Sequence, residues 1–61
     1  MPYVNIKMYK GRSKEVKKEL AKRVTEVVSQ TLHVPENVVW VVIEDVPPDS
    51  WMSGGKMGDE R

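Results

Sequence analysis

Apolar residues alternate with polar or aromatic ones at the start of the chain. The residues that would share one face of a strand are Pro2, Val4, Ile6 and Met8. Because successive side chains of a strand point to opposite faces, this period of two predicts a half-buried strand over residues 2–9.

The period changes to that of a helix after the loop "KGRS". Apolar residues then recur three and four positions apart, at Val16, Leu20, Val24, Val27, Val28 and Leu32. This spacing predicts one amphipathic helix over residues 14–32, with Ser13 as its N-cap. Pro35 cannot continue a helix, so the helix must end before it.

A second, almost continuously apolar segment, "VVWVVIED", covers residues 38–45 and predicts a second strand. Such a strand is typical of burial on both faces, which a single β-α-β unit cannot provide. The order strand, helix, strand favours parallel pairing of residues 2–9 with residues 38–45. The predicted fold class is therefore α/β, built on one β-α-β subunit.

The remaining residues form a short glycine-rich tail, "WMSGGKMGDER". It is too polar to form a core, yet it carries Trp51, Met52 and Met57. Apolar side chains on such a segment indicate that it docks on another subunit. No repeat and no second domain is visible, so residues 1–61 are interpreted as one domain.

The length of the chain limits its core. A chain of 61 residues buries only about 60% of its unfolded surface. Chains below roughly 70–80 residues usually add disulfides, a metal or partner subunits. There is no cysteine, and His33 alone cannot build a metal site. We therefore expect a homo-oligomer without a metal.

The charge is nearly balanced, with ten basic and nine acidic residues and a net charge of +1. This balance gives no electrostatic case for nucleic acid or an anionic membrane. Basic and acidic residues are interleaved along the helix, where Glu19 stands four positions before Arg23, the order that favours an ion pair. No apolar run approaches the ~20 residues of a membrane span, and the start lacks the apolar core of a signal peptide. We expect a cytoplasmic protein.

Proline at position 2 has two interpretations. At the start of a strand, its missing N–H costs no ladder hydrogen bond, so it is merely tolerated. If Met1 is removed, the ring nitrogen becomes a free secondary amine. The pKa of such an amine lies above neutrality, and burial or a nearby guanidinium lowers it. At neutral pH the amine could then accept a proton and return it elsewhere, as general acid–base catalysis requires.

Four other side chains are candidates for a structural or a chemical role. Arg12, in the loop, is a solvated charge or a fork for a carboxylate or enolate oxygen. Trp40 is a packing residue in a core or interface, or a platform for a ligand. Trp51 lines a pocket or an interface, and His33 suits the negative end of the helix dipole. No Ser-His-Asp arrangement is visible, and "SGGK" is too short for a phosphate loop.

Taken together, these features resemble the 4-oxalocrotonate tautomerase family of very small isomerases. The similarity covers essentially the whole chain without gaps. It runs through "MP" at the start, "GRS" at 11–13, the helix, "VP" at 34–35, the strand "VVWVVIEDVP" and the "W-M-S-GG" tail. Each motif alone is weak, whereas all of them in this order are fairly specific.

The resemblance implies a fold and an assembly. It implies a β-α-β subunit with a short C-terminal hairpin and a parallel strand pair. Two such subunits would form a four-stranded sheet, and three such dimers a hexamer. It also implies an isomerase without a cofactor, acting on 2-hydroxy-dienoate or enolpyruvate-type acids such as arise in the degradation of aromatic compounds.

The resemblance further implies roles for individual residues. With Met1 removed, Pro2 would be the general base that moves a proton between oxygen and carbon. Arg12 matches the loop arginine that binds the substrate carboxylate. Trp51 falls where the family has an aromatic residue, which lines the pocket and helps to keep the pKa of the proline amine low.

One position departs from the family pattern. The best-known members carry a second arginine on the second strand, which grips substrate oxygens from a neighbouring subunit, and the aligned residue here is Trp40. One cation that would stabilise developing enolate charge is therefore missing. Either Arg61, Lys7 or Lys56 replaces it, or the substrate is a less charged, aromatic enol in whose binding Trp40 takes part.

Two alternatives to a tautomerase stay open at this stage. The first is a relative that uses protonated Pro2 to assist hydration or dehalogenation of an unsaturated acid, although no group to activate water is apparent. The second is a non-catalytic oligomer with a binding or structural role, which the departure at Trp40 would fit. If Met1 is retained, the Pro2 nitrogen is an amide without usable basicity.

Overall fold

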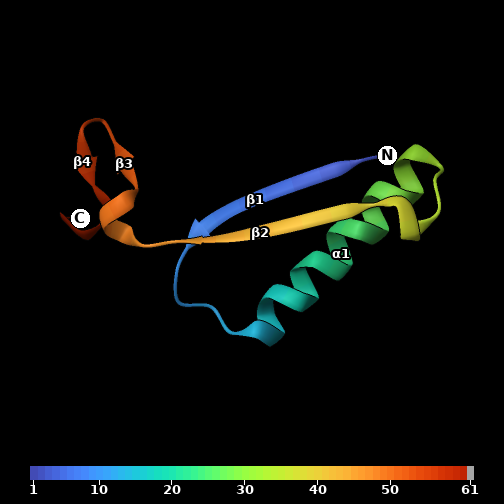
Figure 1. Cartoon of the computed structure of the whole chain (residues 1–61), viewed down its shortest axis with the longest axis horizontal. Helices are drawn as coiled ribbons and strands as arrows, with labels where there is room; N and C mark the ends of the chain where they lie inside the picture. Colours follow the sequence, from blue (N-terminus) through green and yellow to red (C-terminus); the bar gives the residue numbers. More distant parts are fainter. Residues whose placement is uncertain (61) are drawn as a thin grey trace.

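The computed structural model describes residues 1–60 and has the predicted order of elements (Figure 1). A strand, a helix and a second strand are followed by a small antiparallel hairpin. These elements are β1 (Tyr3–Tyr9), α1 (Lys14–Leu32), β2 (Trp40–Val46), β3 (Met52–Ser53) and β4 (Lys56–Met57). The predicted α/β fold class, including the C-terminal hairpin, is confirmed.

The two long strands pair in parallel, as predicted, over their whole length from Tyr3 opposite Trp40 to Tyr9 opposite Val46. Helix α1 covers one face of this pair and packs mainly on β2. The side chains on that face are half-buried, among them Val4, Ile6 and Ile43.

The second strand begins later than the sequence predicted. The prediction placed it over residues 38–45, whereas β2 spans Trp40–Val46. Residues Glu36–Val38 instead form a single 3-10 turn. In this turn the Val38 N–H donates to the Pro35 carbonyl at 3.2 Å. Pro35 is itself extended, with φ −67° and ψ 151°, and it caps this turn, so β2 starts only after the turn has ended.

Both ends of α1 are capped. The Ser13 hydroxyl accepts a hydrogen bond from the Val16 N–H at 3.3 Å, which confirms the predicted N-cap. At the other end His33 adopts the left-handed conformation, with φ 57°, and its N–H donates to the Ser29 carbonyl. This conformation is unusual for a residue other than glycine and closes the helix before Pro35.

Helix α1 makes ion pairs on both its exposed side and the side that faces the strands. On its exposed side the predicted Glu19–Arg23 pair is present, with 2.8 Å between Oε2 and Nε. The hydrogen bond and charge of Arg23 lower the pKa of Glu19. On the side facing the strands, Lys17 bonds Asp45 on β2 at 2.7 Å. This second pair ties the first half of α1 to the end of β2.

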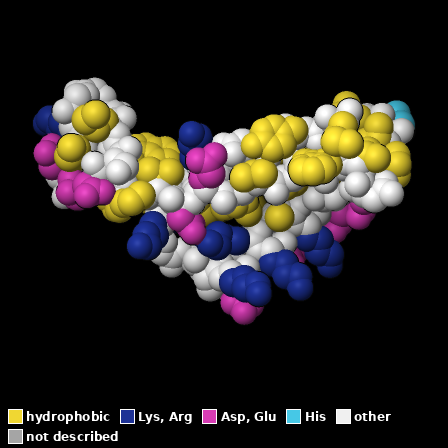
Figure 2. All heavy atoms as spheres, in the orientation of Figure 1, with side chains coloured by type: hydrophobic (Ala, Val, Ile, Leu, Met, Phe, Trp, Pro, Cys, Tyr) yellow, Lys and Arg dark blue, Asp and Glu magenta, His cyan; other side chains and the backbone are white. Residues whose placement is uncertain are grey.

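The other face of the strand pair is largely uncovered, and we call it the open face. It carries Tyr3, Asn5, Lys7 and Tyr9 from β1, with Trp40, Val42, Glu44 and Val46 from β2. No residue among 1–60 is fully buried, and the molecule measures 42 × 24 × 13 Å. A chain this flat has no closed core of its own, as expected for a subunit of an oligomer. Figure 2 shows apolar side chains gathered along one exposed side.

Candidate active site

Pro2 lies directly before β1 and is half-buried. Its carbonyl oxygen accepts a hydrogen bond from the backbone N–H of Trp40 at 3.0 Å. Its nitrogen is joined to Met1, which is 85% exposed. The proline is therefore held by its hydrogen bond to β2, whereas the residue that precedes it extends into solvent.

Trp40 lies next to Pro2, at the first position of β2. In the parallel register it stands opposite Tyr3 on the open face. Both residues are more than half exposed, Trp40 at 55% and Tyr3 at 61%. The interpretation of Trp40 as a core residue is thus wrong within one chain, and its place beside Pro2 leaves the roles of interface residue and ligand platform.

Arg12 lies at the opposite end of the strands, in the loop that joins β1 to α1. The Lys10 N–H donates to the Val46 carbonyl at 2.9 Å and closes the strand pair before this loop. Gly11 has φ 134°, which other residues rarely adopt. The Arg12 side chain is exposed. It makes no ion pair or hydrogen bond to any residue in the range 1–60.

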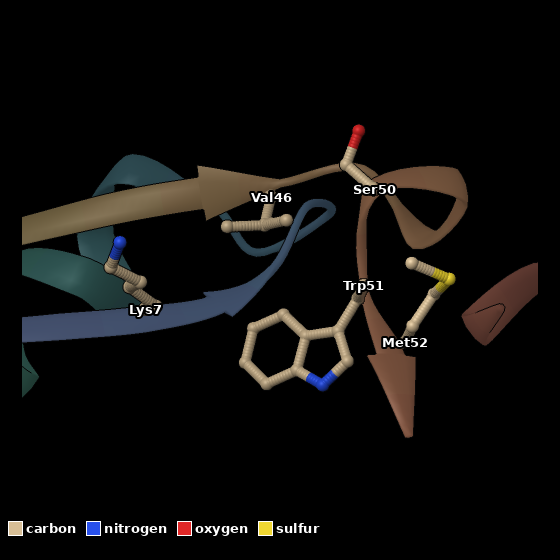
Figure 3. Close-up of a pocket in the computed structure, with 5 residues that line it drawn as sticks. All are labelled: Lys7, Val46, Ser50, Trp51 and Met52. Atoms are coloured by element: carbon tan, nitrogen blue, oxygen red, sulfur yellow. The ribbon is translucent and has the colours of Figure 1, made fainter. Parts of the chain in front are cut away.

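Trp51 lies near the loop end of the strands, just before β3. Its ring meets Tyr9 edge-on, with 5.0 Å between centroids and 72° between planes. Figure 3 shows the indole extending from the hairpin back toward the ends of β1 and β2. Together with Lys7, Val46, Ser50 and Met52, it lines an open pocket of about 310 Å³. The prediction that Trp51 lines a pocket agrees with this geometry.

Gly58 packs closely against Tyr9 and Pro48 and helps to hold the hairpin that carries Trp51. The Gly58 N–H donates to the Trp51 carbonyl at 2.6 Å. A Cβ atom at Gly58 would lie 2.7 Å from the Tyr9 hydroxyl and 2.9 Å from the Pro48 carbonyl oxygen. Only glycine fits this position without displacement, so the turn after β4 closes tightly over Tyr9.

The structure divides the predicted site residues between two ends of one subunit. Pro2 and Trp40 lie where β1 and β2 begin, whereas Arg12 and Trp51 lie where they end. Seven strand residues separate Pro2 from Arg12's loop, a distance of roughly 20 Å along an extended chain. One chain therefore does not bring the candidate base and the candidate carboxylate-binding arginine together.

Of the cations considered as replacements for a second arginine, Lys7 lines the pocket that contains Trp51. It lies beside Trp51 and is paired with Glu44 at 3.8 Å. Glu44 also accepts a hydrogen bond from the Asn5 amide at 2.7 Å. Lys56 lies on β4, and Arg61 is outside the described residues.

Comparison with known proteins decides the family. The family model described as "Tautomerase enzyme" matches residues 2–61. The chain belongs to the tautomerase family. A curated relative from Bacillus cereus, named "Probable tautomerase", is 46% identical over 56 residues, which is 92% of each chain.

Solved tautomerase structures share the whole fold. YwhB, a homologue of 4-oxalocrotonate tautomerase, is 37% identical, with a TM-score of 0.92 and coverage of 98% of both chains. A heterohexamer 4-oxalocrotonate tautomerase from Chloroflexus aurantiacus is also 37% identical, with a TM-score of 0.93 and coverage of 98% of this chain and 97% of that one. The resemblance seen in the sequence is confirmed, and with it the isomerase class.

Residues 1–60 of this tautomerase contain no group of three or more His, Asp or Glu side chains placed to hold a metal ion. Within the same residues, α1 is not apolar enough to cross a membrane, and no other helix is long enough.

Two aromatic residues of the open face, Tyr3 and Tyr9, were not predicted as site candidates from the sequence. Tyr3 stands beside Trp40, and Tyr9 supports Trp51. The alternation of β1 already placed both side chains on the face opposite Val4 and Ile6. The parallel register was the additional signal, because it aligns each tyrosine with one end of β2.

Proposed function

We propose that this tautomerase, with Met1 removed, interconverts enol and keto forms of 2-hydroxy-dienoate or enolpyruvate-type acids, with the Pro2 amine as general base. The observation that carries the proposal is the setting of Pro2. Its carbonyl is held by Trp40 at 3.0 Å, and its nitrogen side leads only to exposed Met1. Removal of Met1 would leave an anchored secondary amine, which is a fixed base.

The proposed reaction needs only proton transfers. The amine takes the proton of the enol hydroxyl as the C–O bond becomes a carbonyl. It then returns a proton to the substrate carbon at the other end of the enol system, which forms the C–H bond. Neither step requires a cofactor. Arg12 would bind the carboxylate through two parallel hydrogen bonds and stabilise the charge that develops on the oxygen.

The separation of Pro2 from Arg12 and Trp51 indicates that the site is completed by another subunit. Assembly would bury the open face and apolar side chains that a single chain leaves exposed. The relative from Chloroflexus aurantiacus is a heterohexamer by name. We therefore propose a homohexamer built from three dimers with four-stranded sheets, in which Arg12 and Trp51 of one copy meet Pro2 of another. Its proposed setting is cytoplasmic degradation of aromatic compounds.

The test is turnover by protein whose Met1 removal is confirmed by mass. Ketonisation of 2-hydroxymuconate and phenylenolpyruvate is followed for wild type and for Pro2→Ala. General acid–base catalysis contributes about 10²- to 10⁴-fold, so Pro2→Ala should reduce kcat by that order. Pro35→Ala, which removes a proline ring from the turn before β2, is the matched control and should retain activity.

Two results would reject the proposal. Equal rates for wild type and Pro2→Ala would remove Pro2 from the mechanism. No turnover of either enol above the buffer rate, by correctly processed protein, would favour a non-catalytic oligomer.

A further inference from the structure

Two exposed aromatic side chains stand together at the Pro2 end of the open face. Tyr3 follows Pro2 in the chain, and Trp40 lies opposite Tyr3 in the register. They are the one register pair of β1 and β2 in which both members are aromatic. Figure 2 shows apolar side chains clustered at the end of the molecule where the chain begins in Figure 1.

Removal of Met1 would open space beside this pair. Met1 is bonded to the Pro2 nitrogen, is highly exposed and makes no hydrogen bond or ion pair through its side chain to the described residues. The space that it vacates would therefore border the free Pro2 amine, which is joined through Pro2 itself to Tyr3.

The part of the open face next to Tyr3 and Trp40 carries no charged side chain. The next pair along the open face is Asn5 with Val42, and the first charged pair is Lys7 with Glu44. Lys7 lies four residues from Tyr3, roughly 13 Å along the strand, and is partnered by Glu44. An anionic group placed against Tyr3 and Trp40 would therefore find no cation from its own strand pair.

We propose that Tyr3 and Trp40 form an aryl-binding wall that makes this tautomerase selective for enol acids with one carboxylate and an aromatic group. This inference rests on the proposed function and narrows its substrate class. Arg12 from another copy would hold the single carboxylate, the Pro2 amine would exchange the protons, and the aryl group would lie on the Trp40 indole.

The same surface disfavours a dicarboxylate. The faces of aromatic rings carry partial negative charge, so they attract ring edges and repel anions. A second carboxylate against this wall would also lose water without gaining a partner, which is costly. An aryl group gains from both ring contact and apolar burial. The wall therefore discriminates between two substrates that share the same reacting enol.

The kinetic test compares kcat/KM for phenylenolpyruvate with kcat/KM for 2-hydroxymuconate. Wild type should prefer the aryl enol by at least about tenfold, since aromatic contact and burial together reach that size. Trp40→Leu should lower kcat/KM for phenylenolpyruvate about five- to tenfold, mainly through KM, and Trp40→Phe should restore most of it. Trp40→Arg should shift the ratio toward 2-hydroxymuconate, because it adds a cation for the second carboxylate.

Val42→Leu, on the same face but next to Asn5, is the matched control and should leave the ratio unchanged. Sedimentation of each variant separates substrate binding from assembly. One outcome is that Trp40→Leu dissociates in sedimentation while the fraction that stays assembled keeps the wild-type ratio of the two kcat/KM values. In that case Trp40 is an interface residue and the proposal is wrong.

A binding measurement keeps this inference distinct from the catalytic proposal. Trans-cinnamate and muconate are titrated while the two indole N–H resonances are followed by NMR, assigned with Trp40→Phe and Trp51→Phe. Cinnamate should shift the Trp40 signal at lower concentration than muconate does, even if neither enol is turned over. Equal affinities, or no effect on Trp40, would overturn the aryl wall. Loss of Pro2 dependence with cinnamate binding intact would overturn only the catalytic role.

Discussion

The Trp40 backbone N–H and the Pro2 carbonyl oxygen are joined by a hydrogen bond of 3.0 Å. The bond uses the oxygen of Pro2 and leaves its nitrogen uninvolved. Excision of Met1 therefore changes the chemistry of the nitrogen from amide to amine without breaking the contact that fixes the residue. The beginning of β2 holds the candidate base in place in both forms of the chain.

A chain that retains Met1 should fold and assemble but should not turn over the enols. Its Pro2 nitrogen is an amide, whereas the bond to Trp40 is unchanged. Two forms of the protein are compared. One carries a short N-terminal extension before Met1, and the other is the same protein cleaved so that it begins at Pro2. Circular dichroism and sedimentation should agree between the two forms. The cleaved form should be faster by about 10² or more. Comparable rates would exclude the free amine as the base.

Replacing Gly58 should disturb the hairpin that carries Trp51. A Cβ atom at this position would lie 2.7 Å from the Tyr9 hydroxyl and 2.9 Å from the Pro48 carbonyl. Overpacking of this kind costs about 1–3 kcal/mol, so Gly58→Ala should lower the free energy of unfolding and change the near-ultraviolet signal of Trp51.

The double variant Tyr9→Phe/Gly58→Ala provides the control for this clash. It removes the hydroxyl that lies nearest to the added methyl group, so it should recover part of the lost stability relative to Tyr9→Phe alone. A strictly additive double variant would show that the Tyr9 contact does not carry the cost.

Two elements of the fold could be predicted from the sequence because each has its own periodicity. The period of two gave β1, and the helical spacing gave α1 with the bounds that the structure shows. The start of β2 was misplaced because Val38 and Val39 favour strands by residue type, whereas the 3-10 turn Glu36–Val38 is a local backbone conformation that residue type does not reveal.

The arrangement of the candidate site could be predicted only in part. Pro2, Arg12 and Trp51 stood out by type and spacing, yet their separation along the strand pair emerged only from the register. Residue type did not decide the place of Trp40 either, since an apolar strand suits a core as well as an open face. The alternation of β2 settled it, because Trp40 shares its face with Glu44 and not with Ile43.

Arg12 should act in substrate binding. The side chain is exposed and makes no ion pair within residues 1–60, so its removal should not weaken the fold. A hydrogen bond to a charged group contributes about 1.5–3 kcal/mol, so Arg12→Gln should reduce kcat/KM about 10- to 100-fold, chiefly through KM. Lys10→Gln, two residues earlier in the same loop, is the control and should behave as wild type. Unaltered kinetics of Arg12→Gln would remove it from the site.

His33→Gly should stabilise the protein. His33 holds the left-handed conformation at the end of α1, with φ 57°, which costs a residue with a side chain roughly 1–2 kcal/mol. Glycine avoids that cost but loses more entropy on folding, so the net gain expected is about 0.5–1 kcal/mol. Denaturant unfolding of wild type, His33→Gly and His33→Ala measures it, with alanine no more stable than wild type. A destabilised glycine variant would indicate that the imidazole makes a contact that matters, for example in the assembly.

The stability of this tautomerase should depend on its concentration. None of residues 1–60 is fully buried in the single chain, so complete burial of its apolar side chains requires contacts between copies. Sedimentation should give a mass several times the 7.0 kDa of the subunit, and Tm should rise with protein concentration because association stabilises the folded form. Val42→Glu, which places a charge on the open face, should dissociate the oligomer and lower Tm. Lys18→Glu, on the exposed side of α1, changes charge without touching that face and should leave both unchanged. A folded monomer at micromolar concentration, with a Tm independent of dilution, would contradict the assembly and with it the completion of the site by a second copy.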